Sequence, residues 1–242
     1  VAVRYSEVKE VEMSDRSDRD ERIETVAVLA DPVRRRLYDA VVGSDAGLSR
    51  DQAAATASVP AHSARFHLDK LADAGLLAVE ERRLNGRTGP GSGRPAKVYV
   101  RIRDAVSVSV PARHYDLVGS VFASAVERSL AGEDLAAALS DEAHMAGHDD
   151  GTRFAAPKTH AREEDRAAAV LSARGYDPYE TDEGVRLRNC PFDALATDHT
   201  DLVCGVNRDY VEGVVEGLGC RHLDAVLDPG EDRCCVRISR GR

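Results

Sequence analysis

The sequence predicts an α+β fold: a helical N-terminal part that ends in a β-hairpin, linking and dimerisation helices, and a small cysteine-containing α+β part. Two observations carry this prediction. Helix start and stop signals fill residues 31–75, and two strand-like runs around a loop rich in Gly and Pro follow them. All five cysteines come after residue 189: Cys190, Cys204, Cys220, Cys234 and Cys235. With 242 residues, the chain is long enough to bury sizeable hydrophobic cores.

Three helices are expected in the N-terminal part. The first begins at Pro32, because Asp31 suits the N-cap and a proline in the first turn sacrifices no hydrogen bond. Ser49 caps a short second helix over residues 50–57. The third helix covers residues 61–75 and ends at Gly75. Three apolar residues of this helix recur at helical spacing and are expected in the core: Ala64, Leu68 and Leu71.

Two strands, LLAVEERRL (76–84) and KVYVRI (97–102), flank the loop NGRTGPGSGRPA. Three helices followed by a hairpin with a basic tip is the order of a winged helix-turn-helix, which we place at residues 20–105. Residues 1–19 are expected to form a flexible N-terminal segment.

The charge distribution favours a nucleic-acid partner for this domain. The chain has a formal net charge of −9, yet the stretch from Arg82 to Arg103 contains seven basic residues and no acid. In a helix-turn-helix the third helix enters the major groove, where Arg65 can make a bidentate contact to guanine. The predicted DNA contacts are His62, Ser63, Arg65, His67 and Lys70 on this helix, and Arg87 and Arg94 on the wing.

Three segments resemble the winged-helix regulators of the ArsR type: LADPVRRRLYDAVV, VPAHSARFHLDKLADAGLL and GRPAKVY. The resemblance implies a regulator that binds double-stranded operator DNA as a homodimer. No secretory signal and no stretch of about eighteen apolar residues is visible, so we expect a cytoplasmic protein without a membrane span.

Residues 106–160 are expected to form linking and dimerisation helices. One helix is predicted over Tyr115–Leu130, and its apolar stripe Val118, Phe122 and Val126 is either a dimer contact or core against the C-terminal domain. A second helix is predicted over Asp134–Ala146. The segment GHDDGTRFAAPKTH after it is expected to be a polar connection.

Residues 161–242 are expected to form the α+β sensor domain. A helix over Arg162–Arg174 ends at Gly175, and a longer one is predicted over about Leu202–Leu218. Four strands are expected, over residues 176–180, 184–188, 222–227 and 234–238.

The cysteines admit three interpretations in a reducing cytosol. In the first interpretation the cysteines are simply small buried hydrophobic residues, which suits Cys220 best. In the second interpretation they hold zinc, although the compact C-x-x-C pairs that are typical of structural zinc sites are absent from the sequence. In the third interpretation they hold an iron–sulfur cluster, which accepts thiolates from dispersed positions in the sequence. Because neighbouring residues of a strand point to opposite faces, at most one of Cys234 and Cys235 is expected to face a shared site comfortably.

The segment from Cys190 to Ile238 resembles the C-terminal domain of the repressors of iron–sulfur-assembly operons, the SufR family. The resemblance implies a [4Fe-4S] or [2Fe-2S] cluster on Cys190, Cys204 and Cys234. Cys235 is an alternative closing ligand, and His199 is one candidate for the fourth ligand. Cys220 and Cys235 are additions to the family pattern.

The sequence therefore predicts a transcriptional repressor that senses iron or redox status through an iron–sulfur cluster. The alternatives are a zinc-binding or thiol-switch regulator, or a regulator with a small-molecule pocket and structural cysteines. A thiol enzyme with Cys190 or Cys204 as nucleophile and His199 as base is also conceivable. We do not expect an enzyme, because the sequence shows no oxyanion loop and no group to orient the base.

Overall fold

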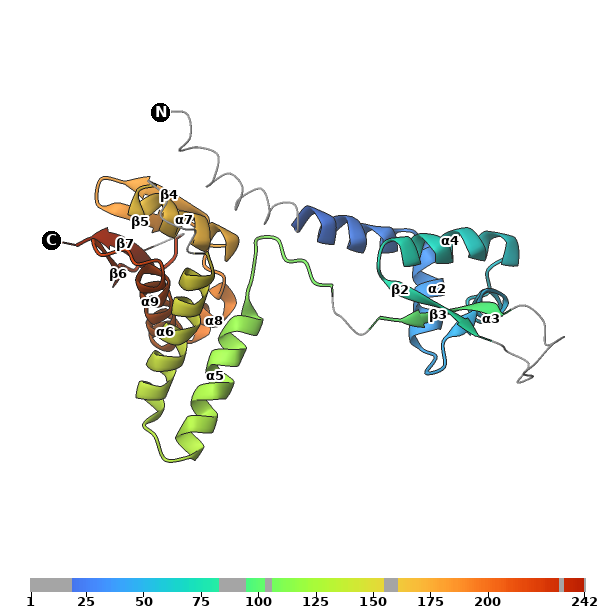
Figure 1. Ribbon diagram of the computed structural model, residues 1–242, viewed down its shortest axis with the longest axis horizontal. Coiled ribbons are helices and arrows are strands. Elements are labelled where there is room, and N and C mark those ends of the chain that lie inside the picture. Colours follow the sequence, from blue (N-terminus) through green and yellow to red (C-terminus); the bar gives the residue numbers. More distant parts are fainter. Residues whose placement is uncertain (1–18, 83–94, 103–105, 155–160, 231–232, 242) are drawn as a thin grey trace. The chain divides into compact units, whose positions relative to one another are not determined.

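The computed structural model describes residues 19–82, 95–102, 106–154, 161–230 and 233–241. These residues form two compact units, one up to Val108 and the other from Ser109 onward (Figure 1). The predicted N-terminal segment, residues 1–19, lies almost wholly outside the described residues, and residues 19–27 are helical. No helix in the described ranges is long and apolar enough to cross a membrane.

The N-terminal unit contains the three predicted helices, α2 (Pro32–Val42), α3 (Arg50–Thr56) and α4 (Ala61–Asp73). Their predicted caps are confirmed. The carboxylate of Asp31 accepts hydrogen bonds from the backbone N–H groups of Val33 and Arg34 at 2.8 and 3.1 Å. Ser49 and Gln52 form a reciprocal capping box at the start of α3.

An antiparallel sheet closes this unit, with strand order β1-β3-β2. Its strands are β1 (Leu48–Ser49), β2 (Leu77–Arg82) and β3 (Ala96–Arg101). β2 and β3 pair along their whole length, as the two strands of a wing do. The core contains the predicted α4 residues Ala64, Leu68 and Leu71, all fully buried. The unit therefore has the element order and core of a winged helix-turn-helix.

We expect Ser49→Ala to lower the free energy of unfolding of this unit by about 1 kcal/mol, because the capping box loses its hydroxyl acceptor. Ser49→Thr keeps that acceptor and is the matched control. Denaturant titration of both variants checks the prediction. An alanine variant as stable as the threonine variant would show that the cap contributes nothing.

Among the described residues, the C-terminal unit combines five helices with a four-stranded antiparallel sheet of order β4-β5-β7-β6. Its helices are α5 (Tyr115–Leu130), α6 (Leu135–Phe154), α7 (Glu163–Ala173), α8 (Asp193–Asp198) and α9 (Thr200–Gly217). Its strands are β4 (Pro178–Thr181), β5 (Gly184–Leu187), β6 (Leu223–Leu227) and β7 (Val236–Arg240). All the predicted elements are present. The short helix α8 had not been recognised in the sequence, and α6 is longer than predicted.

Helix α6 continues through most of the segment that we expected to be a polar connection. The reason is a close crossing with α9, in which two glycines on each helix face the other helix. A Cβ atom at Gly147 or Gly151 would collide with the backbone of α9, and one at Gly213 or Gly217 with the backbone of α6. The helices can approach this closely only because these four positions lack side chains.

A buried carboxylate explains why the polar sequence of α6 lies inside. Asp150 is almost fully buried, accepts a hydrogen bond from the hydroxyl of Tyr210 at 2.6 Å and pairs with Arg174. Because its charge is compensated and hydrogen-bonded, burial of this residue is tolerated.

Helices α5 and α6 share a core with the elements that follow residue 160. Val118 and Val121 of α5 and Ala143 of α6 belong to the same cluster as Tyr210 and Val236. The boundary expected at residues 160 and 161 therefore does not separate two cores.

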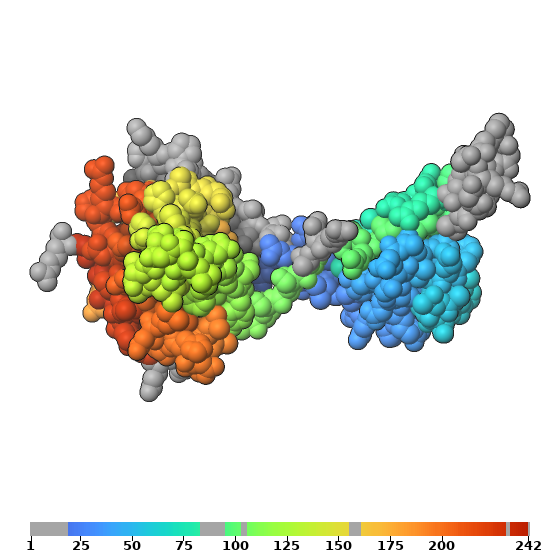
Figure 2. All heavy atoms as spheres, turned by 90° about the horizontal axis from the view of Figure 1, so that it is seen from below, coloured from blue at the N-terminus to red at the C-terminus, as the bar shows by residue number. Residues whose placement is uncertain are grey.

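The stripe predicted on α5 is divided between core and surface. Val118 is buried, Phe122 is partly buried, and Val126 is exposed. The core interpretation therefore holds for Val118. Figure 2 looks onto the region of the α5–α6 turn, where Leu130 is 84% exposed.

Candidate functional site

Four of the five sulfurs gather where α9 begins and β7 is about to start. Cys204 lies in the second turn of α9, Cys190 precedes α8, and Cys234 and Cys235 directly precede β7. The two adjacent cysteines have different partners, since Cys234 pairs with Cys190 and Cys235 with Cys204. The residues stand just before the strand, where the strict alternation of strand side chains does not apply.

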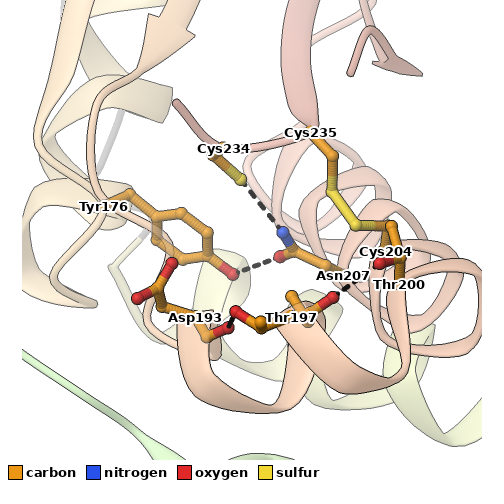
Figure 3. The surroundings of a disulfide bond; sticks show 9 residues. Tyr176, Asp193, Thr197, Thr200, Cys204, Asn207, Cys234 and Cys235 are labelled. Atoms are coloured by element: carbon orange, nitrogen blue, oxygen red, sulfur yellow. Dashed lines mark hydrogen bonds between the residues drawn. A yellow bond between two sulfur atoms is a disulfide. The ribbon is translucent and has the colours of Figure 1, made fainter. Parts of the chain in front are cut away.

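Cys204 and Cys235 are joined by a disulfide, with their Cα atoms 6.2 Å apart (Figure 3). The bond ties the first turns of α9 to the segment that leads into β7. The sequence had placed Cys204 in the site and had named Cys235 only as an alternative ligand.

Cys190 and Cys234 form the second sulfur pair, and both are free thiols joined by a hydrogen bond. This hydrogen bond, together with burial, raises the pKa of Cys190 well above its ordinary value. The same hydrogen bond is the largest influence that lowers the pKa of Cys234. Of the two, Cys234 is therefore the sulfur that carries negative charge more readily.

An asparagine that the sequence analysis missed contacts this pair. Asn207 lies one turn after Cys204 on α9, and its side-chain amide donates a hydrogen bond to the sulfur of Cys234 at 3.2 Å (Figure 3). The hydroxyl of Tyr176 donates to the amide oxygen of Asn207 at 2.6 Å. A polar residue three positions after a cysteine on an otherwise apolar helix face was the available signal.

Cys220 lies at the opposite end of α9 from Cys204, and His199 is the residue before this helix. Cys220 follows the C-terminal end of α9, roughly 20 Å of helix from Cys204 at 1.5 Å per residue. It accepts a hydrogen bond from Arg166 at 3.4 Å, and burial raises its pKa to about 11. His199 is exposed, and no hydrogen bond links it to a cysteine within the described ranges.

The donor set has the right chemistry for a metal or cluster, but in the disulfide form its arrangement does not fit one. No group of three or more His, Cys, Asp or Glu side chains within the described ranges is arranged to hold a metal ion. Two of the four sulfurs are consumed by the disulfide. Reduction would give four thiols from three segments, which is the ligand type that iron–sulfur clusters use.

The second candidate surface is the outward face of α4. His62 and Lys70 are exposed, Ser63 is partly exposed, and the Arg65 side chain is 71% exposed. Arg65 lies 3.7 Å from the carboxylate of Asp69, which in turn accepts a hydrogen bond from Tyr99 at 2.7 Å. Asp69 therefore helps to orient the guanidinium away from the core.

His67, another predicted contact, is less exposed than Arg65 on the same helix. Its side chain is only 15% exposed, and its Nδ1 atom lies 4.0 Å from the carboxylate of Asp31, at the cap of α2. It faces the interior of the unit because it follows Ala64 by three positions on the buried side. Phe66, which is 62% exposed, stands on the outward face instead.

The wing contacts cannot be placed in the same way. Arg87 and Arg94 lie outside the described residues. Arg82, at the end of β2, pairs with Glu80 and donates to the carbonyl of Ala46 at 2.5 Å, so this part of the basic stretch has partners within the unit.

Residues 29–80 match a family model described as a helix-turn-helix domain. Over this segment the chain is similar to helix-turn-helix domains. The match runs from just before α2 into β2, and it leaves the C-terminal unit uncovered. No curated protein and no solved structure matches the chain. The helix-turn-helix domain, with the paired strands β2 and β3 beside it, indicates a DNA-binding transcriptional regulator.

We expect Arg65→Ala to weaken specific binding by the helix-turn-helix domain by about 1–3 kcal/mol and to relax preference at one base pair. Arg87→Ala is the comparison, because the wing arginines are the predicted phosphate contacts, and loss of a phosphate contact weakens all sequences alike and flattens the salt dependence. Fluorescence anisotropy with a selected operator and scrambled DNA measures both effects. If Arg65→Ala left affinity and preference unchanged, α4 would enter the groove in another register.

Proposed function

We propose that the chain is a cytoplasmic, homodimeric transcriptional repressor whose C-terminal unit senses iron or redox status through its four-sulfur site. The observation that carries the proposal is the gathering of Cys190, Cys204, Cys234 and Cys235 in a unit attached to a helix-turn-helix domain. Thiols collected from three distant segments suit a sensor, because a change at one place affects all three.

In the first form of the proposal, the reduced site holds an iron–sulfur cluster on Cys190, Cys204 and either Cys234 or Cys235. When bound, the cluster would make the site responsive to oxidants and to iron shortage, because both lead to loss of the cluster. The donor set supports this form. Zinc is the alternative occupant, because thiolates also bind zinc.

In the second form, the sensor is a thiol–disulfide switch. The disulfide between Cys204 and Cys235 favours it, because these two residues already have a geometry that permits the bond. An oxidised small-molecule disulfide would take two electrons from the two thiols and leave as two thiols.

A set of contacts suggests how either change could reach the helix-turn-helix domain. Arg113, in the segment between that domain and α5, donates to the side chain of Asn189 at 2.6 Å and contacts Asp193 at 3.3 Å. The backbone N–H of His114 donates to the carbonyl of Pro191 at 3.2 Å. Asn189 and Pro191 flank Cys190, so the loop that carries this sulfur also holds the connecting segment.

The sensor would act by differential stabilisation. A ligand shifts an equilibrium only by its different affinity for the two states. We propose that the site with its cluster bound holds the connecting segment in the conformation in which the protein binds its operator tightly. Loss of the cluster would release the connecting segment. In the cluster form, Cys190 is the sulfur from which this release would start.

The test begins with protein purified without oxygen. Visible absorption and the iron and sulfide content per chain decide between cluster, zinc and neither. Operator affinity is then measured at one salt concentration for the loaded, reduced metal-free and oxidised forms. The cluster form predicts tightest binding by loaded protein, and the switch form predicts a difference between reduced and oxidised protein. Equal affinities of all forms would exclude sensing by these sulfurs, and equal affinities in a protein that also lacks metal would favour a small-molecule sensor.

Arg113→Ala tests the transmission step separately. We expect it to keep the bound metal or the disulfide and to lose most of the affinity difference between states. Arg188→Ala is the matched control, because Arg188 lies at the end of the same loop but stacks on Tyr179 and pairs with Asp177. A wild-type response in Arg113→Ala would refute this route.

A further inference from the structure

The two sulfur pairs of the site have the same chemical composition but different surroundings. Cys204 and Cys235 are bonded to each other, whereas Cys190 and Cys234 remain a hydrogen-bonded pair of thiols. The hydrogen bond through which Cys190 and Cys234 shift each other's pKa makes them neighbours, yet they are not bonded to each other.

Hydrogen-bond donors around Cys234 distinguish the second pair. Its sulfur accepts from the amide of Asn207 at 3.2 Å, and the backbone N–H groups of Cys235 and Val236 also point to it. Donors stabilise a thiol or thiolate sulfur, which carries more negative charge than a disulfide sulfur does. They therefore favour the reduced form of the pair.

Asn207 is the one side-chain amide among these donors, and its orientation is fixed. The residue is fully buried. The hydroxyl of Tyr176 donates to the amide oxygen, and the NH₂ group of the same amide faces the sulfur of Cys234 (Figure 3). The ring of Tyr176 is itself held by stacking on Tyr210, with centroids 6.4 Å apart.

We infer that Asn207 is a positioning residue that keeps Cys190 and Cys234 in the dithiol form, so that the site contains one readily oxidised pair and one resistant pair. The oxidant is a small-molecule disulfide, RSSR. Its reaction with two thiols forms one protein disulfide and two RSH molecules, with two electrons and two protons passing to RSSR. The inference rests on the proposed sulfur site but needs no bound cluster.

The experiment uses the full chain, reduced and freed of metal, equilibrated in buffers of increasing RSSR to RSH ratio. Mass spectrometry after thiol blocking gives the occupancy of each disulfide. In wild-type protein the Cys204–Cys235 bond should form first. Asn207→Leu, of nearly the same size but without a donor, should favour the Cys190–Cys234 disulfide by about tenfold.

Two further variants separate the role of Asn207 from general loss of packing. Tyr176→Phe leaves the amide in place but frees it to rotate, so we expect a shift in the same direction and smaller. Tyr210→Phe is the control, because it removes a hydroxyl that is bonded to Asp150 and not to Asn207. The Cys204–Cys235 equilibrium is a reference within each sample, and it should change little.

These measurements test the role of Asn207 independently of whether the protein binds a cluster. An unchanged Cys190–Cys234 equilibrium in both Asn207→Leu and Tyr176→Phe would overturn the inference, as would absence of that disulfide from every variant in the most oxidising buffer. If Asn207→Leu does not fold, the inference is tested by comparing the Cys190–Cys234 equilibrium in Tyr176→Phe with that in Tyr210→Phe. Lack of iron in the anaerobically purified wild-type protein would refute the cluster proposal and leave this result standing.

Discussion

Gly147→Val is expected to unfold the C-terminal unit, or to leave it only marginally stable. The new side chain would meet the backbone of α9 near Tyr210, and a backbone cannot move aside as a side chain can. Overpacking of a core costs about 1–3 kcal/mol where side chains can adjust. Against main chain we expect at least the upper end of that range, a large part of the few kcal/mol by which a domain is stable.

The chain offers a control of opposite sign on α9 itself. Gly205 has open space where its Cβ would be, so Gly205→Ala should stabilise the unit by about 0.4–1 kcal/mol. Denaturant unfolding followed by the near-ultraviolet signal of the buried tyrosines measures both variants. A Gly147→Val protein as stable as wild type would mean that α6 and α9 do not cross as described.

Complete loss of bound iron is expected when Cys190, Cys204 or Cys234 is replaced by Ser. Each removes one thiolate from the proposed ligand set, and a hydroxyl is a poor substitute for a soft ligand. Cys220→Ser is the control that should retain iron, because Cys220 lies at the far end of α9. Cys235→Ser decides which of the adjacent cysteines closes the site. The measurement is iron and sulfide per chain after anaerobic purification.

The same variants separate the two sensing modes. In a thiol switch, Cys204→Ser and Cys235→Ser should abolish the response to oxidant, whereas Cys190→Ser should leave it. In a cluster sensor, Cys190→Ser should abolish it as well. Full iron content in Cys190→Ser protein would remove that residue from the ligand set.

The helix-turn-helix domain could be predicted closely from sequence because its signals are local. Asp31, Pro32 and Ser49 mark helix starts within one or two residues, and apolar spacing identified the buried face of α4. The helix over Tyr115–Leu130 was predicted to the residue for the same reason. The exposure of His67 was misjudged, since it depends on contact with the cap of α2 and not on its own helix.

The α6–α9 crossing and the pairing of the sulfurs could not be predicted, because both depend on partners distant in sequence. Gly147 looks like a helix breaker until Gly213 is placed opposite it. Asp150 appears to belong on the surface until Arg174 and Tyr210 surround it. Which of Cys234 and Cys235 meets Cys204 is set by how the segment before β7 passes α9, and the spacing of cysteines does not contain that information.

The strand order of the C-terminal unit also determines when this part of the molecule can form during synthesis. β7, the last strand in sequence, lies inside the sheet between β5 and β6, and β6 has no other partner strand among the described residues. The N-terminal unit has no such dependence, since its sheet and helices are complete before Val108. A ribosome-bound chain can therefore present a folded helix-turn-helix unit before the last strand of the C-terminal sheet has been synthesised.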